Sequence, residues 1–142
     1  MAKENHYIKM EFSACDSNVA AARLAAAVFC TELGFTFTEV EEIKVAVSEG
    51  VSNAIIHGYG GDESGRVELT MTVIESMMEL TVKDFGVGIA DVAKAMEPAY
   101  SSLEDRMGLG FVFMDSFMDS LDVISAPKEG TLVRMRKRCP CL

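Results

Sequence analysis

The chain has 142 residues, enough for one domain with its own hydrophobic core. Hydrophobic residues make up 49% and charged residues 25%, as in a folded globular protein and unlike a disordered one. The formal net charge of -9 argues against a protein that binds nucleic acid directly through its phosphates. No apolar run approaches the ~20 residues of a membrane span, and the N-terminus lacks a signal peptide's apolar stretch. We therefore expect a cytoplasmic protein with no membrane or nucleic-acid partner.

The first half of the chain has patterns typical of one strand and two helices. Apolar and polar residues alternate from Tyr7 to Phe12, which predicts a half-buried strand. The alanine-rich segment from Ser17 to Leu33 begins with N-capping residues and ends at a glycine, so it predicts a helix. Thr38 and Glu41 match a capping box and predict a second helix that runs to about His57.

The second half is richer in predicted strands. Alternation predicts four of them, at Val67–Val73, Met78–Val82, Leu121–Ser125 and Leu132–Arg136. A helix from about Gly110 to Met118 separates the first two from the last two. Helices early and antiparallel strands late favour an α+β sandwich, with helices on one face of a mixed sheet. With no linker or repeat, we expect a single domain over residues 1–142, of which 136–142 form a flexible tail with free thiols.

Two polar residues lie beside the core-facing stripe of the second predicted helix. That stripe is formed by residues that fall in a narrow sector at ~100° per residue: Ile43, Val47, Gly50 and Ala54. Glu49 and Asn53 are four residues apart, so their side chains are one turn apart at the border of the stripe. A carboxylate and an amide there suit Mg²⁺ shared with substrate phosphates. An ordinary helix-surface pair is the alternative.

A carboxylate followed by two glycines ends the predicted strand Met78–Val82. The segment reads Asp84-Phe85-Gly86-Val87-Gly88. It places a hydrogen-bond acceptor next to backbone that a flat ring can approach closely. The alternative is a strand-to-loop turn in which glycine supplies a positive φ angle.

A second glycine pair precedes the predicted helix in Arg106-Met107-Gly108-Leu109-Gly110. Glycines at a helix N-terminus expose N–H groups to an anion, and the helix dipole favours negative charge there. Arg106 adds a guanidinium for a terminal phosphate. The segment from Ile89 to Asp105 is a candidate lid over a nucleotide. Gly-x-Gly alone is more often a simple turn.

In their order, these three segments resemble the ATP-binding motifs of the GHKL superfamily, which contains gyrase, Hsp90-type chaperones, histidine kinases and MutL-type repair ATPases. Residues 48–59 resemble its N-box, Asp84–Ile89 looks like its first glycine box, and Met107–Gly110 like its second. Within the superfamily the chain is most similar, over essentially its whole length, to the anti-sigma-F factors, small serine kinases of bacterial sporulation and stress control. The resemblance implies the two-layer Bergerat fold, with helices on one face of a mixed, mainly antiparallel sheet.

The resemblance also implies roles for the polar residues. Asn53 would be the ligand of a Mg²⁺ ion that bridges the phosphates. Glu49 would be the general base that accepts the proton of an attacking serine hydroxyl. Arg106 would stabilise charge on the γ-phosphate.

By the same resemblance, ATP or ADP would bind with its adenine amino group hydrogen-bonded to Asp84. Gly86 and Gly88 would shape the adenine pocket, with Thr131 beneath the base. Gly108 and Gly110 would contact the phosphates.

The implied function is that of an anti-sigma factor. It would bind a sigma factor and use ATP and Mg²⁺ to phosphorylate a serine of an anti-anti-sigma antagonist of the STAS type, as a homodimer. Family members have a Thr-Thr-Lys-Pro-type segment in the lid, whereas this chain has no lysine between Glu97 and Arg106. The alternative is therefore an ATP-gated module that binds a sigma factor without effective kinase activity.

Overall fold

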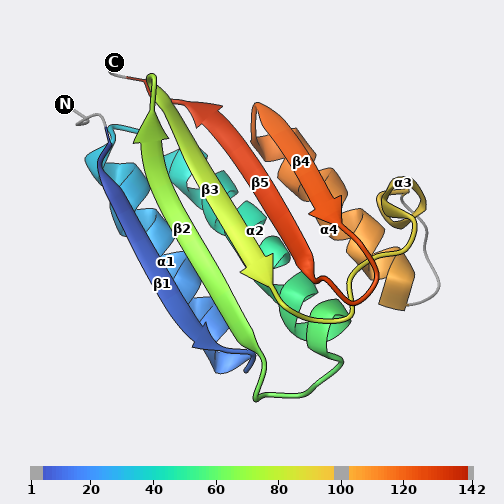
Figure 1. Cartoon of the computed structure of the whole chain (residues 1–142). Coiled ribbons are helices and arrows are strands. Elements are labelled where there is room, and N and C mark those ends of the chain that lie inside the picture. Colours follow the sequence, from blue (N-terminus) through green and yellow to red (C-terminus); the bar gives the residue numbers. More distant parts are fainter. Residues whose placement is uncertain (1–4, 98–102, 141–142) are drawn as a thin grey trace.

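The computed structural model describes residues 5–97 and 103–140, and the side chains of the same residues except 103–106. A five-stranded sheet lies in front of a layer of helices (Figure 1). The strands are β1 (Tyr7–Ser13), β2 (Arg66–Ile74), β3 (Met77–Asp84), β4 (Ser120–Ser125) and β5 (Thr131–Arg138). The helices are α1 (Ser17–Glu32), α2 (Phe37–Asn53), the π-helix η1 (Ala54–Gly58), α3 (Val92–Ala95) and α4 (Leu103–Phe117).

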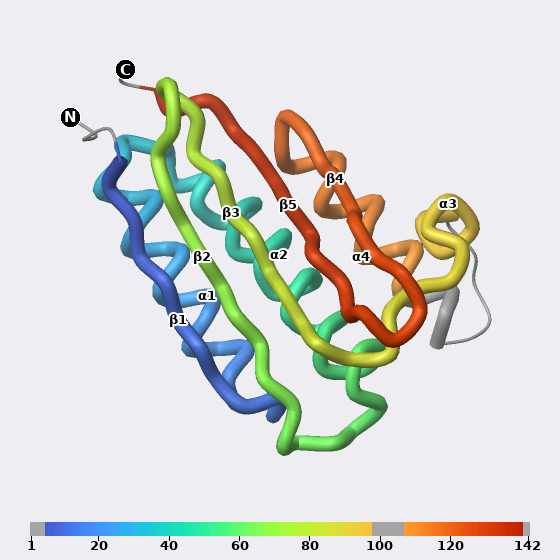
Figure 2. Tube along the Cα trace, in the orientation of Figure 1, coloured from blue at the N-terminus to red at the C-terminus, as the bar shows by residue number. Residues whose placement is uncertain are grey.

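The strands are ordered β1-β2-β3-β5-β4, so the last strand of the chain lies between β3 and β4 (Figure 2). All four pairings among the described strands are antiparallel. The predicted two-layer α+β class is thus confirmed, with a fully antiparallel sheet in place of the mixed sheet that we expected. The long helices α1, α2 and α4 cover one face of the sheet, and no helix of the described residues covers the other face (Figure 1).

The second helix begins earlier than the sequence predicted. Thr36 is its N-cap in extended conformation, and its hydroxyl accepts the N–H of Glu39 at 3.2 Å. Glu39 Oε1 in turn accepts the N–H of Thr36 at 3.0 Å, which completes a capping box. The predicted box of Thr38 and Glu41 is therefore wrong, because Thr38 already lies in the first helical turn.

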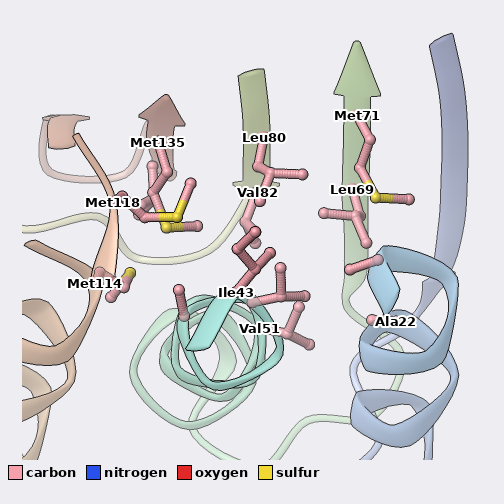
Figure 3. Close-up of a cluster of buried hydrophobic side chains, with 14 of the residues drawn as sticks. Ala22, Ile43, Val51, Leu69, Met71, Leu80, Val82, Met114, Met118 and Met135 are labelled. Carbon is pink, nitrogen blue, oxygen red and sulfur yellow. The ribbon is translucent and has the colours of Figure 1, made fainter. Parts of the chain in front are cut away.

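The hydrophobic core lies between α2 and the central strands (Figure 3). The predicted stripe, which runs along α2 and ends at Ala54 in η1, is buried at all four positions, with Ile43 and Val47 0% exposed. Opposite it lie buried residues of the strands and α4: Leu69, Met71, Leu80, Val82, Met114 and Met135. Methionine side chains adapt their shape to irregular gaps, so they suit the junction between α2, α4 and β5.

The end of the chain is more ordered than the sequence predicted. β5 continues through Arg138, and Arg136 forms an ion pair of 2.8 Å with Glu79 on the neighbouring strand. Cys139 is only 3% exposed, and its N–H donates to the carbonyl of Ser76 at 2.9 Å. Residues 136–140 therefore belong to the fold, which corrects the predicted tail; Cys141 lies outside the described residues. No helix in the described ranges is long and apolar enough to cross a membrane.

Candidate functional site

A pocket lies at one end of the sheet, where α2 and η1 meet the end of β3 and the first turns of α4. Four predicted site residues line it, namely Asn53, Asp84, Gly88 and Thr131. Its apolar walls come from β3, the loop after it, α4 and β5: Val82, Ile89, Met107, Phe111 and Val133. A mainly apolar pocket with a few polar groups is the usual form of a small-molecule site.

Asp84 is one of the polar residues that line this pocket. It is the last residue of β3 and is only 5% exposed. Its Oδ1 accepts the N–H of Gly86 at 3.0 Å. Burial raises the pKa of the Asp84 carboxyl, an effect that the backbone N–H groups of Gly86 and Thr131 partly offset. A carboxylate held in such a dry site bonds strongly to a matching donor and is costly to leave without one.

Glycines let the loops around Asp84 pack backbone against backbone. At Gly86, a Cβ would lie 1.9 Å from the carbonyl oxygen of Gly58. Gly88 has φ +75°, and a Cβ there would lie 1.9 Å from the carbonyl oxygen of Ala126. Gly130, to which the sequence assigned no role, has φ +78° and lies against the carbonyl of Asp84. Only glycine fits these positions, so the loop after β3 and the β4–β5 turn form one compact wall.

Ser125 holds two pocket-lining residues in place, a role that the sequence did not reveal. Its hydroxyl accepts the N–H of Ile89 at 2.8 Å and lies 2.8 Å from the carbonyl of Gly130 and from the hydroxyl of Thr131. Thr131 is also paired with Asp84 across β3 and β5. Ser125 thereby joins the loop after β3 to the start of β5. A serine at the end of a strand has no distinctive sequence pattern. Its role became visible only from the pairing of β4 with β5, which places Ser125 opposite Thr131.

Glu49 and Asn53 lie together against α4. Both are half-buried, as predicted for the border of the core stripe. A Cβ at Gly110 would lie 2.9 Å from Glu49 Oε2 and 3.4 Å from Asn53 Nδ2. The Asn53 amide nitrogen is buried without a hydrogen-bond partner among the described residues. A buried amide that lacks a partner points to a ligand that completes its bonding.

The residues here fit a magnesium ion that takes few of its ligands from the protein. An Asn side chain can present its oxygen or its nitrogen at one place by a half-turn, so Asn53 can offer an oxygen ligand. In the described part of the chain no group of three or more His, Cys, Asp or Glu could hold a metal. A cation at Asn53 would therefore be held mainly by water and ligand phosphates, as Mg²⁺ commonly is.

The second glycine pair lies inside a helix. We predicted that α4 starts at about Gly110, but it begins at Leu103. A Cβ at Gly108 would lie 2.2 Å from the carbonyl oxygen of Glu97, so this glycine allows the segment after α3 to pack on α4. Backbone N–H groups from the fifth helical residue onward bond within the helix. The predicted helix N-terminus at this pair is thus wrong, and phosphate contact by Gly108 or Gly110 stays a prediction.

The remaining predicted elements are described only in part. Arg106 lies in the first turn of α4, and its side chain is outside the described residues. The candidate lid contains the short helix α3, capped by Asp91, whose carboxylate accepts the N–H of Lys94 at 3.1 Å. Residues 98–102 of the lid are also outside the described residues.

Known proteins share this architecture. The family model described as a histidine kinase-like ATPase domain matches residues 12–137. A two-domain structure, the RsbU and RsbW domains of Rv1364c from Mycobacterium tuberculosis, superposes with a TM-score of 0.67 at 18% identity. The match covers 94% of this chain and 32% of that one. The catalytic domain of the histidine kinase ThkA gives 0.56 at 12% identity, over 93% of this chain and 97% of that one.

Curated relatives are much more similar in sequence. The anti-sigma F factor of Clostridium novyi is 44% identical over 133 residues, which cover 92% of this chain and 93% of the relative. That of Oceanobacillus iheyensis is 43% identical, over 92% of this chain and 91% of the relative. The chain therefore belongs to the histidine kinase-like ATPase domain family and, within it, to the anti-sigma F factors.

Proposed function

We propose that this chain is an anti-sigma factor that binds a sigma factor and, with ATP and Mg²⁺, phosphorylates a serine of its anti-anti-sigma antagonist. The observation with most weight is the placement of Glu49 beside Asn53 and its partnerless buried amide nitrogen, next to the Asp84 pocket. Asn53 as the metal ligand and Asp84 as the adenine-binding carboxylate would share one pocket, with Glu49 as the general base next to Asn53. The name shared by the curated relatives, anti-sigma F factor, supports the sigma-factor half.

Nucleotide recognition would rest on Asp84. Its buried carboxylate would accept a hydrogen bond from the adenine amino group, while Ile89, Met107 and Val133 exclude water from the base. Gly86 and Gly88 keep the adjacent backbone close enough for a flat ring to lie against it. Thr131 would lie beneath the base, as its place in the pocket lining permits.

Phosphoryl transfer would use the α2 side of the pocket. Mg²⁺, when bound at Asn53, would neutralise charge on the phosphates. Glu49 would accept the proton of the serine hydroxyl, and Arg106 would stabilise charge on the transferred group. Positioning and charge neutralisation provide most of the rate in such reactions, so the close contact of Glu49 and Asn53 with α4 is the relevant geometry.

We also propose that the chain forms a homodimer through β1. This strand is at the edge of the sheet, so one side of its backbone has no partner strand among the described residues. Apolar side chains beside it are exposed: Ile8 on β1 is 43% exposed, and Leu24 and Val28 on α1 are 62% and 66% exposed. An edge strand flanked by exposed apolar residues readily pairs with another chain.

The decisive experiment is phosphoryl transfer in vitro. The protein, ATP, Mg²⁺ and the STAS-type antagonist encoded in the same genome should yield a product phosphorylated on one serine, identified by mass spectrometry. Glu49→Gln should abolish transfer while ADP still binds. Glu42→Gln, on the same helix and outside the pocket lining, is the matched control and should transfer normally. A wild-type protein that binds ATP but never phosphorylates the antagonist would support the alternative, an ATP-gated sigma-binding module.

A further inference from the structure

Tyr59 links the two strands that end beside the pocket. Its hydroxyl donates to the carbonyl oxygen of Arg66 and accepts the N–H of Phe85 at 2.7 Å. Arg66 is the first residue of β2, and Phe85 directly follows Asp84, the last residue of β3. The phenol therefore extends the interstrand bonding just beyond the last pairing of β2 with β3, next to the pocket carboxylate.

The Tyr59 ring packs directly against the backbone of Gly65. A Cβ at Gly65 would lie 2.5 Å from the ring, so only glycine at that position lets the ring reach Phe85. The Phe85 ring lies 4.2 Å from the guanidinium carbon of Arg66 and 5.0 Å from Lys83 Nζ. The residue after Asp84 is thus held through both its backbone and its side chain.

The neighbouring residue of η1 holds the next part of the loop. The carbonyl of Gly58 accepts the N–H of Val87 at 3.0 Å, and a Cβ at Gly58 would lie 2.9 Å from Asp84 Oδ1. In Figure 1 this segment, which follows α2, lies beside the end of β3. Gly58 and Tyr59 together contact residues 84, 85 and 87, so the end of the N-box helix shapes the loop that orients Asp84.

We propose that Tyr59 is a positioning residue for nucleotide recognition: its hydroxyl fixes the peptide at Phe85 and thereby the direction in which Asp84 presents its carboxylate to the base. This inference rests on the proposed function, in which Asp84 accepts the adenine amino group. A carboxylate discriminates between bases only if it is held near the donor position, so loss of the phenol hydroxyl should reduce selectivity more than overall binding.

The test compares two nucleotides by isothermal titration calorimetry. Purine riboside 5′-diphosphate is an ADP analogue that lacks only the amino group, so it cannot donate the hydrogen bond to Asp84. The wild-type protein should bind ADP at least ~10-fold more tightly than this analogue, since the analogue leaves a buried carboxylate without its donor. Tyr59→Phe should weaken ADP binding by about 5- to 10-fold and change analogue binding by less than about twofold.

Two further variants make the result specific. Gly65→Ala displaces the Tyr59 ring without removing its hydroxyl and should also lower the ADP preference. Tyr7→Phe removes an equivalent hydroxyl from an exposed position on β1 and should leave both affinities unchanged. If either site variant melts at a much lower temperature, the ratio of the two affinities, measured below its melting point, still decides the question.

The outcomes separate the inference from the proposed function. An unchanged ADP preference in Tyr59→Phe, whether both nucleotides bind as before or both weaken equally, would overturn the positioning role. A wild-type protein that binds ADP and the analogue equally would overturn the adenine assignment of Asp84, and this inference with it.

Discussion

The carboxylate of Asp84 lies directly against the Cα atom of Gly58. A Cβ at position 58 would lie 2.9 Å from both Cγ and Oδ1 of Asp84, closer than such atoms approach in proteins. The end of the π-helix and the end of β3 are therefore in contact through a residue without a side chain. Any larger residue at position 58 would have to displace the carboxylate from its place in the pocket lining.

Asp84→Asn should bind nucleotide more weakly and yet unfold at a higher temperature. Loss of a charged acceptor should reduce ADP affinity by about 10- to 100-fold, as for hydrogen bonds to charged groups. Because burial disfavours the charged carboxylate, its neutral isostere should raise the Tm of the nucleotide-free protein by about 2–5 °C at pH 7. Differential scanning calorimetry and ADP titration test the two effects separately.

The stability difference between these two proteins should depend on pH. The pKa of Asp84 is raised in the folded protein above its ordinary value of 3.8. At pH values between the ordinary and the raised pKa, the folded state therefore binds more protons than the unfolded chain. Wild-type stability therefore gains on the variant as the pH falls through the raised pKa. The advantage of Asp84→Asn should be larger at pH 7 than at pH 4. An equal difference at both pH values would contradict a buried, charged Asp84.

Gly110→Ala should impair phosphoryl transfer without destabilising the fold. The added methyl would lie 2.9 Å from Glu49 Oε2, so the Glu49 and Asn53 side chains must move. Alanine is also favoured over glycine inside a helix by up to ~1 kcal/mol, which should keep Tm at or above the wild-type value. We expect kcat to fall at least ~10-fold, because even a small displacement of catalytic groups raises the activation barrier. A variant with normal kcat would show that the contact between α4 and Glu49 does not matter for transfer.

Val28→Glu should convert the proposed homodimer into a monomer. Val28 is 66% exposed on α1 beside the edge strand β1, and a buried carboxylate there would oppose association. Ile124→Lys is the matched control, because Ile124 is 54% exposed on β4, the opposite edge of the sheet. Analytical ultracentrifugation should show a dimer for the wild type and this control. A monomeric wild type, or loss of the dimer in the control alone, would exclude β1 as the interface.

Cys30 should resist alkylation while the protein is folded. Burial, with a smaller contribution from Cys139, raises the pKa of the Cys30 thiol from 9.0 to about 12, and its side chain is 0% exposed. Since the thiolate is the reactive form, iodoacetamide at pH 8 should label the half-buried Cys15 well before Cys30. In urea both should react at similar rates. Peptide mass spectrometry reads each site separately, and equal labelling in the native state would contradict the burial of Cys30.

The sequence predicted those parts of the structure that depend on periodicity. Alternation located every strand within three residues of its ends, and the helical stripe correctly placed Glu49 and Asn53 at the border of the core. The position of Asp84 at a strand's end could be predicted because a clear alternating pattern leads up to it. These signals are local, so they survive without knowledge of tertiary contacts.

The errors arose where local patterns were ambiguous or where tertiary contacts decide. Thr36/Glu39 and Thr38/Glu41 have the same capping-box spacing, and only the extended backbone of Thr36 distinguishes them. The glycine pair predicted a helix start at about Gly110, whereas the lack of a side chain at Gly108 accommodates the backbone of Glu97. The contacts of Tyr59 have no recognisable spacing in the sequence, because they depend on the ends of β2 and β3 meeting in space.

The position of β5 between β3 and β4 has a consequence for synthesis of the protein. Thr131 pairs with Asp84 although the two residues lie far apart in the sequence, and Gly130 packs against the carbonyl of Asp84. A nascent chain that has emerged from the ribosome only as far as β4 would have α2 and β3 but would lack Thr131 and Val133, two of the residues that line the pocket. The proposed nucleotide site should therefore be complete only once β5 has been synthesised, so a chain truncated before β5 should bind nucleotide less tightly than the full chain.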